Sequence, residues 1–210
     1  MAASKPQIRS MFATPVCVHF HPVAQEANLE LRPLILEKAQ NLAANNNHGQ
    51  GWRSPADFES WGGAQALTLF RILRDLADSL TATRAGARLT LDWKIAAAAT
   101  IRQKGEYQER AARPGAFWAG VYYVDDGYQK SDDEALGGEC ELADPRGVLP
   151  AMIAPSLGFR VPNGLTAGQM ETIRPQSGMI ILHPAWQPRG ERRYDGNAQR
   201  VAVEFDLAVP

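Results

Sequence analysis

The last strand-like segment of the chain gathers ionisable side chains on one face. In QRVAVEFDLAV (199–209), alternate residues of a strand point to opposite faces, so Arg200, Glu204 and Asp206 share one face with Ala202. The apolar residues share the other face and can pack under helices: Val201, Val203, Phe205 and Leu207. An arginine inside a β-sheet protein is costly unless an anion or a carboxylate meets it. The segment therefore indicates either an anion-binding site or a buried ion pair.

Side chains that ligate metals or act as nucleophiles are few and scattered. The chain has four histidines and two cysteines: His19, His21, His48, His183, Cys17 and Cys140. His19 and His21 have the spacing of a zinc-type pair, but such a pair on an edge strand is usually surface. The cysteines are far apart, so we expect buried reduced thiols. The sequence has no G-x-S-x-G elbow and no phosphate-binding glycine loop, which argues against nucleophilic catalysis and nucleotide binding.

The bulk properties exclude several classes of protein. The chain has 210 residues, of which 45% are hydrophobic and 21% charged, as in a soluble globular domain. Its net charge of −1 gives no reason to expect a nucleic-acid partner. The N-terminus lacks an apolar core of signal-peptide length and no window reaches the length of a membrane span. We expect a cytoplasmic protein with no membrane partner.

Two helices are predicted before a series of strands. Apolar spacing predicts helices over 24–47 and 64–83, with Pro33 expected near the first turn of the first helix. Segment 51–63, between them, is expected to be a loop around two tryptophans. β-branched and aromatic residues predict strands at 12–20, 88–101, 116–124, 137–142, 170–175, 178–186 and 199–209. The polar segment 125–138 is expected to be a solvated hairpin loop.

Strands that follow helices, without alternating with them, favour an antiparallel architecture. We therefore predict a mainly β fold with two or more N-terminal helices packed on one sheet. The chain is expected to form a single domain over 1–210, with a strand and helical cover in 1–85 and the β core in 86–210.

The order of several segments resembles a known family. FATPV (12–16), GWRS (51–54), GEYQ (105–108), GAFWAGVYYV (115–124), ADPR (143–146), IRPQSGMIILHPAW (173–186) and QRVAVEFD (199–206) follow one another at workable spacing. Together they resemble the bacterial putative 2-oxoglutarate/Fe(II)-dependent oxygenase family. The resemblance implies a double-stranded β-helix core, also called a jelly-roll or cupin-like core.

The family's chemistry needs two histidines and a third ligand that hold Fe(II) and leave positions open for 2-oxoglutarate and oxygen. By the resemblance, the three ligand positions fall on Ala111, Arg113 and Arg189, and the arginine that grips 2-oxoglutarate falls on Arg200. Alanine has no donor atom, and arginine stays protonated and offers no lone pair. We therefore expect Fe(II) to be absent, while 2-oxoglutarate stays a candidate ligand.

If these positions are right, Arg113, Arg189 and Arg200 converge on one cavity, and their charges need compensation. One alternative is a bound small anion, with Trp118, Tyr122 and Trp186 lining the pocket. The other is pairing with internal acids, for which the candidates are Glu139, Glu141 and Glu204.

Three functions follow from these observations. The first is a pseudo-oxygenase that has lost iron binding and binds a small anion or dicarboxylate through Arg200, Arg113, Arg189, Tyr122 and Trp186. The second is an active 2-oxoglutarate-dependent dioxygenase with relocated ligands. The third is a structural jelly-roll protein that forms a homodimer.

Overall fold

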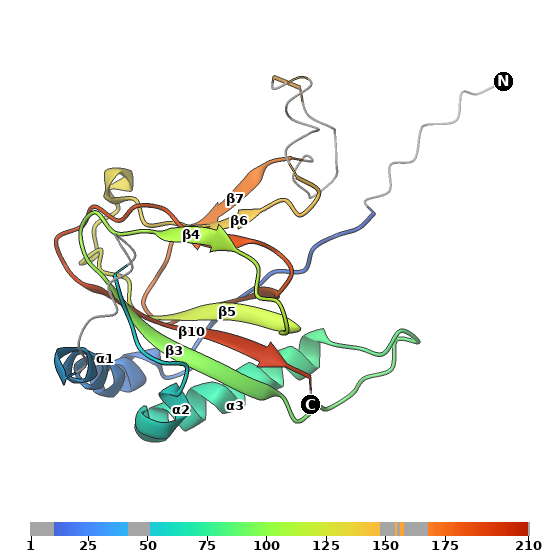
Figure 1. The fold of residues 1–210 in the computed structure, drawn as a ribbon, viewed down its shortest axis with the longest axis horizontal. Helices are drawn as coiled ribbons and strands as arrows, with labels where there is room; N and C mark the ends of the chain where they lie inside the picture. Colours follow the sequence, from blue (N-terminus) through green and yellow to red (C-terminus); the bar gives the residue numbers. More distant parts are fainter. Residues whose placement is uncertain (1–10, 42–50, 148–153, 155, 158–167, 210) are drawn as a thin grey trace.

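The computed structural model describes residues 11–41, 51–147, 154, 156–157 and 168–209. Two antiparallel sheets lie face to face, and helices cover the outer side of the larger sheet (Figure 1). No helix of the described residues is long and apolar enough to cross a membrane. The division of the chain into a helical cover and a β core stays a prediction.

The larger sheet has six strands in the order β1-β8-β5-β10-β3-β2. Their bounds are Cys17–Phe20 for β1, Met179–Pro184 for β8, Trp118–Asp125 for β5, Arg200–Ala208 for β10, Lys94–Arg102 for β3 and Trp52–Arg53 for β2. Each neighbouring pair is antiparallel. The long strand β10 lies between β5 and β3, so both of its backbone edges are hydrogen-bonded within the sheet.

The smaller sheet has four strands in the order β4-β9-β6-β7. Their bounds are Gln108–Ala111 for β4, Arg189–Glu191 for β9, Cys140–Ala143 for β6 and Met170–Ile173 for β7. Neither β4 nor β9 is among the strands that the sequence predicts. Both are short and carry charged residues instead of the β-branched residues that mark a strand.

Three helices pack on the outer face of the larger sheet: α1 (Ala24–Asn41), α2 (Phe58–Trp61) and α3 (Gly63–Leu80). The buried residues of α3 recur at helical spacing and form the stripe that meets the sheet: Ala66, Leu69, Phe70, Leu73 and Ala77. On the sheet side they meet Val201, Val203, Phe205 and Leu207 of β10, as the alternation in that strand predicts.

The structure corrects two local predictions. Pro33 lies in the middle of α1 instead of its first turn. Because proline has no N–H, the carbonyl of Leu29 lacks its helical donor. Both Pro33 and Leu29 are exposed, so water can solvate that carbonyl. Segment 51–63 is not all loop, because it contains β2 and α2. Part of the predicted first helix, 42–47, lies outside the described residues.

A second, smaller core lies between the two sheets. It is formed by apolar or aromatic residues from both: Val121, Tyr123, Cys140, Leu142, Met179, Ile181 and Ala202.

Both cysteines are free thiols, with Cys17 partly buried and Cys140 buried. Of segment 125–138, Asp125 ends β5 and the rest is a loop with one short 3-10 helix, η1 (Glu134–Leu136).

Candidate functional site

A cluster of arginines and glutamates, the ionic network, occupies the space between the two sheets beside this smaller core. It consists of six residues: Arg53, Arg102, Arg113, Arg189, Glu191 and Glu204. They come from β2, β3, the segment after β4, β9 and β10, so five segments distant in sequence meet here. Two of the six, Arg53 and Arg113, are partly exposed and the other four are buried.

Glu204 is the centre of this network. Its Oε1 accepts a hydrogen bond from Arg102 Nη2 at 3.0 Å and lies 3.8 Å from Arg189 Nη1. Its Oε2 accepts from Arg113 Nη2 at 3.0 Å and from Arg53 Nη1. Four guanidiniums therefore surround one carboxylate, which is 2% exposed.

Glu191 is the second buried carboxylate. Arg189 Nη2 donates to its Oε1 at 2.5 Å, and Tyr123 Oη donates to the same oxygen at 2.8 Å. Arg102 Nη1 lies 2.9 Å from Oε2 of Glu191, so the Arg102 guanidinium bridges the two acids. The network is thus a connected arrangement and not a set of separate pairs.

Burial and the neighbouring charges shift the pKa values of Glu204 and Glu191 in opposite directions. Burial favours the neutral form of Glu204, but the surrounding guanidiniums, led by Arg102, outweigh it and hold the pKa of this carboxyl well below its usual range. Burial likewise opposes ionisation of Glu191, and Arg102 and Arg189 lower its pKa overall. Both glutamates are therefore ionised at neutral pH, and the network carries alternating charges.

Arg200 is held apart from Glu204. Its Nε donates to the carbonyl of Asp126 at 2.9 Å and its Nη1 donates to the carbonyl of Gly138. Its guanidinium also lies over two aromatic rings, 4.8 Å from the centroid of Tyr128 and 4.5 Å from that of Tyr194. Of the three arginines expected to converge, Arg113 and Arg189 share Glu204, whereas Arg200 uses carbonyls and ring faces.

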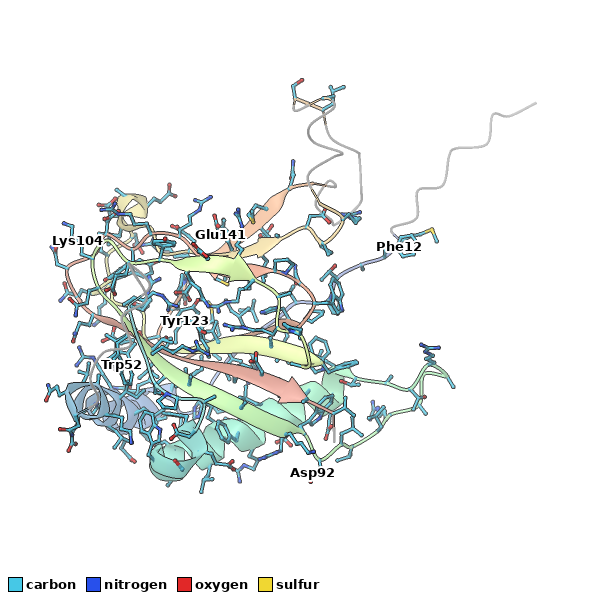
Figure 2. All side chains as sticks on the ribbon, in the orientation of Figure 1. Phe12, Trp52, Asp92, Lys104, Tyr123 and Glu141 are labelled. Carbon is cyan, nitrogen blue, oxygen red and sulfur yellow. The ribbon has the colours of Figure 1, made fainter. Side chains whose placement is uncertain are left out.

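The aromatic residues expected to line a pocket lie elsewhere. Tyr122 faces the helices and donates its hydroxyl to Asn28 Oδ1 at 2.5 Å, and Trp118 also packs in the helix-covered core. Trp186 is 56% exposed. The inward-facing ring is Tyr123, which lies between the two sheets in Figure 2. The tyrosine of β5 that faces the space between the sheets is therefore Tyr123 and not the expected Tyr122, because neighbouring residues of a strand face opposite sides.

The three positions that the resemblance assigns to iron ligands are neighbours in the fold. Ala111 of β4 is the register partner of Arg189 of β9, and the backbone N–H of Arg113 donates to the carbonyl of Ala185, just before β9, at 2.7 Å. The side chains present do not fit Fe(II), because a methyl group and two guanidiniums supply no lone pair. Over the described ranges, no group of three His, Cys, Asp or Glu residues is placed to hold a metal ion.

The three histidines in the described part of the chain form no metal-binding group that could replace these ligands. His183 of β8 is buried, with Nδ1 3.0 Å from the carbonyl of Pro184. Burial and the nearby charge of Arg189 lower its pKa to about 4, so its ring is neutral at pH 7. His21 is buried beside Tyr122, with ring centroids 5.6 Å apart, and His19 is on the edge strand β1. His48 lies outside the described residues.

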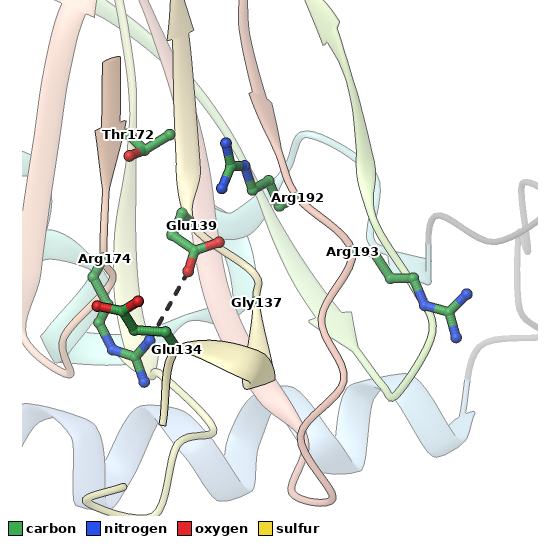
Figure 3. Close-up of a pocket in the computed structure, with 7 residues that line it drawn as sticks. All are labelled: Glu134, Gly137, Glu139, Thr172, Arg174, Arg192 and Arg193. Carbon is green, nitrogen blue, oxygen red and sulfur yellow. Dashed lines mark ion pairs between the residues drawn. The ribbon is translucent and has the colours of Figure 1, made fainter. Parts of the chain in front are cut away.

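Of the acids expected to compensate the arginines, Glu204 alone lies in the network. Glu141 is on the outer side of the smaller sheet (Figure 2), where it pairs with Arg110 at 3.3 Å and Arg192 at 2.8 Å. Glu139 lies 3.9 Å from Arg174 and lines an open groove of about 670 Å³ (Figure 3). The groove is lined by Glu134, Gly137, Glu139, Thr172, Arg174, Arg192 and Arg193.

Sequence reasoning missed Arg53, Arg102, Glu191 and Tyr123. The signal for Glu191 is its spacing from Arg189, since residues two apart in a strand share a face. Arg102 ends a strand in which half of the preceding residues are alanine, and it pairs in register with Arg200. Nothing in its local sequence marks it as an internal residue.

Comparisons with known proteins agree with this architecture. The profile of the family described as "Putative 2OG-Fe(II) oxygenase" matches residues 98–206. A prolyl hydroxylase from Trichoplax adhaerens, solved with a hypoxia inducible factor peptide, is 12% identical, with a TM-score of 0.63 over 92% of this chain and 83% of that one. No curated protein sequence matches the chain.

Two further solved structures have a similar fold. A prolyl-4-hydroxylase from Pseudomonas putida is 12% identical, with a TM-score of 0.61 over 93% of this chain and 92% of that one. HygX from Streptomyces hygroscopicus, solved with nickel and 2-oxoglutarate, is 11% identical, with a TM-score of 0.59 over 93% of this chain and 83% of that one. These likenesses show the double-stranded β-helix fold, and the profile match over more than half of the chain shows that it belongs to the 2OG-Fe(II) oxygenase family.

Proposed function

We propose that this chain is a pseudo-oxygenase, a member of the family whose β-helix interior does not hold iron. The observation that carries the proposal is the position of Arg189. Its buried guanidinium lies between Glu191 and Glu204, and its backbone is in register with Ala111. The ionic network would then occupy the place where the family resemblance puts a metal.

Charge supports this proposal. A guanidinium stays protonated in any folded protein, so Arg189 and Arg113 cannot become ligands by losing a proton. Two positive charges at ligand positions also repel a dication, and the repulsion is strong where burial lowers the dielectric constant. Glu191 and Glu204 could supply oxygen donors only by giving up their arginine partners, which would leave buried guanidiniums uncompensated.

The test is to purify the protein anaerobically with excess Fe(II), to remove unbound metal, and to measure iron per chain and succinate formed from 2-oxoglutarate. We expect iron well below one equivalent and no succinate. An active dioxygenase with relocated ligands would bind about one equivalent of Fe(II) and form succinate, and either result would overturn the proposal.

A second candidate function is the binding of a dicarboxylate such as 2-oxoglutarate without turnover. It is favoured by one observation: Arg200 is 1% exposed, and its Nη2 has no hydrogen-bond partner among the described residues. An anion would stabilise a buried guanidinium nitrogen that lacks a hydrogen-bond acceptor. Calorimetric titration of 2-oxoglutarate into the metal-free protein and into an Arg200→Lys variant tests this. Binding that the variant weakens supports it, and absence of binding to the unaltered protein refutes it.

A further inference from the structure

Two partly exposed guanidiniums, the outer arginine pair of Arg53 and Arg113, connect the ionic network to solvent. Arg53 is on the edge strand β2 of the larger sheet, and Arg113 follows β4 of the smaller sheet. Both donate to the same oxygen, Oε2 of Glu204. The side chains of Arg53 and Arg113 are 41% and 30% exposed, whereas that of Glu204 is 3% exposed. Solvent therefore reaches the pair but not the carboxylate that it shares.

The charges of this region do not balance. The described ion pairs connect four guanidiniums with three carboxylates, those of Glu191, Glu204 and Asp206. The buried arginines are enclosed by Glu191 and Glu204. The surplus positive charge is therefore at the outer arginine pair, where an ion from solvent can approach it.

The outer arginine pair also has donors to spare. A guanidinium carries five N–H groups in a planar fork that fits two oxygens of a carboxylate or phosphate. Arg53 uses Nη1 for Glu204, and Arg113 uses Nη2. Asp206 Oδ1 lies 3.9 Å from Arg113 Nε and competes with an anion on that side. The more open donors are therefore those of Arg53.

The geometry points to a binding site for a small oxyanion, a phosphate or carboxylate group, held by Arg53 and Arg113 at the outer edge of the ionic network. The site rests on the proposed function in one respect, since Arg113 is free to hold an anion only if it does not lie beside bound iron. It is distinct from Arg200, whose guanidinium is held by other groups.

The experiment uses the full chain and inorganic phosphate as the probe, at constant ionic strength set with chloride. Phosphate affinity is measured by calorimetry and by the rise in melting temperature, because a ligand that binds the folded state stabilises it. We expect Arg53→Ala to weaken phosphate binding about tenfold or more, since a charge-assisted contact is lost. Asp206→Asn removes the competing carboxylate and is expected to tighten binding. Arg71→Ala, an exposed arginine of α3, is the matched control and is expected to bind as the unaltered protein does.

Acetate and succinate arms distinguish the two sources of the oxyanion: a response to phosphate alone indicates a phosphate group, and a response to the carboxylates alone indicates a carboxylate. If Arg53→Ala does not fold, Arg53→Lys keeps the charge but loses the fork and is expected to bind more weakly. The site is refuted if no probe binds the unaltered protein, or if Arg53 variants bind as tightly as Arg71→Ala. The iron content of the same preparations is measured as well, and it tests the proposed iron-free interior. A protein that binds no anion can still be free of iron, so the two measurements separate failure of the anion site from failure of the proposed function.

Discussion

Replacing Glu204 with glutamine tests the ionic network most directly. The substitution keeps the shape of the side chain but removes the negative charge that faces four guanidiniums. Arg102 and Arg189 would then share Glu191 as their remaining carboxylate among the described ion pairs. Removing one partner from a buried charge cluster leaves an uncompensated charge in a poorly solvated site.

The size of the effect can be estimated from the distances. Glu204 lies 3.0 Å from Arg102 and 3.0 Å from Arg113. At an effective dielectric constant of about 20, one pair at about 4 Å is worth about 4 kcal/mol, and the desolvation of a buried charge costs several kcal/mol. After this offset, we expect Glu204→Gln to lower the free energy of unfolding by about 3–5 kcal/mol.

The assay is urea unfolding at pH 7, followed by tryptophan fluorescence. Glu141→Gln is the matched control, because Glu141 pairs with Arg110 and Arg192, which are 48% and 53% exposed. Such partly exposed pairs contribute about 0–1 kcal/mol. If Glu204→Gln costs no more than Glu141→Gln, the network does not hold the two sheets together, and the reasoning is refuted.

The same network predicts how stability depends on pH. The folded-state pKa values of Glu204 and Glu191 are depressed, so the unfolded chain binds more protons than the folded one in the acid range. The two carboxylates make their full contribution to the free energy of unfolding above their unfolded-state pKa of about 4.3. This contribution is lost as the pH falls from there through their lower folded-state pKa values. The difference in unfolding free energy between the unaltered protein and Glu204→Gln is therefore expected to shrink below about pH 4.

Three further substitutions test separate features by urea unfolding. Tyr122→Phe removes the hydrogen bond to Asn28 and is expected to cost about 0.5–1.5 kcal/mol without changing anion binding; loss of anion binding would contradict its place among the helices. Gly138→Ala places a methyl group against the Arg200 guanidinium at a backbone φ of +77° and is expected to cost about 1–3 kcal/mol; a neutral result would contradict this contact. Leu73→Ala in α3 empties a fully buried site and is expected to cost about 2–5 kcal/mol, whereas a cost below 1 kcal/mol would contradict its burial.

Much of the fold could be predicted because its signals are local. The alternation in β10 predicted which residues meet the helices, and apolar spacing over 64–83 predicted the helix α3. The strands β4 and β9 could not be predicted, since their short charged sequences form strands only through pairing with each other and with β6. They carry two of the three positions assigned to iron ligands, Ala111 and Arg189, so the part of the fold nearest the site had the weakest local signal.

What the sequence by itself determined is the set of charges. It has alanine at position 111 and arginines at 113 and 189, so no metal donor at these three positions, and a carboxylate two residues from an arginine in β9. Only the tertiary structure decided which charges meet. Glu204 faces Arg102 and Arg189, while Arg200 turns to the carbonyls of Asp126 and Gly138. The physical reason is that alternation along a strand chooses a face, whereas the partner across the interior depends on the register and approach of strands distant in sequence.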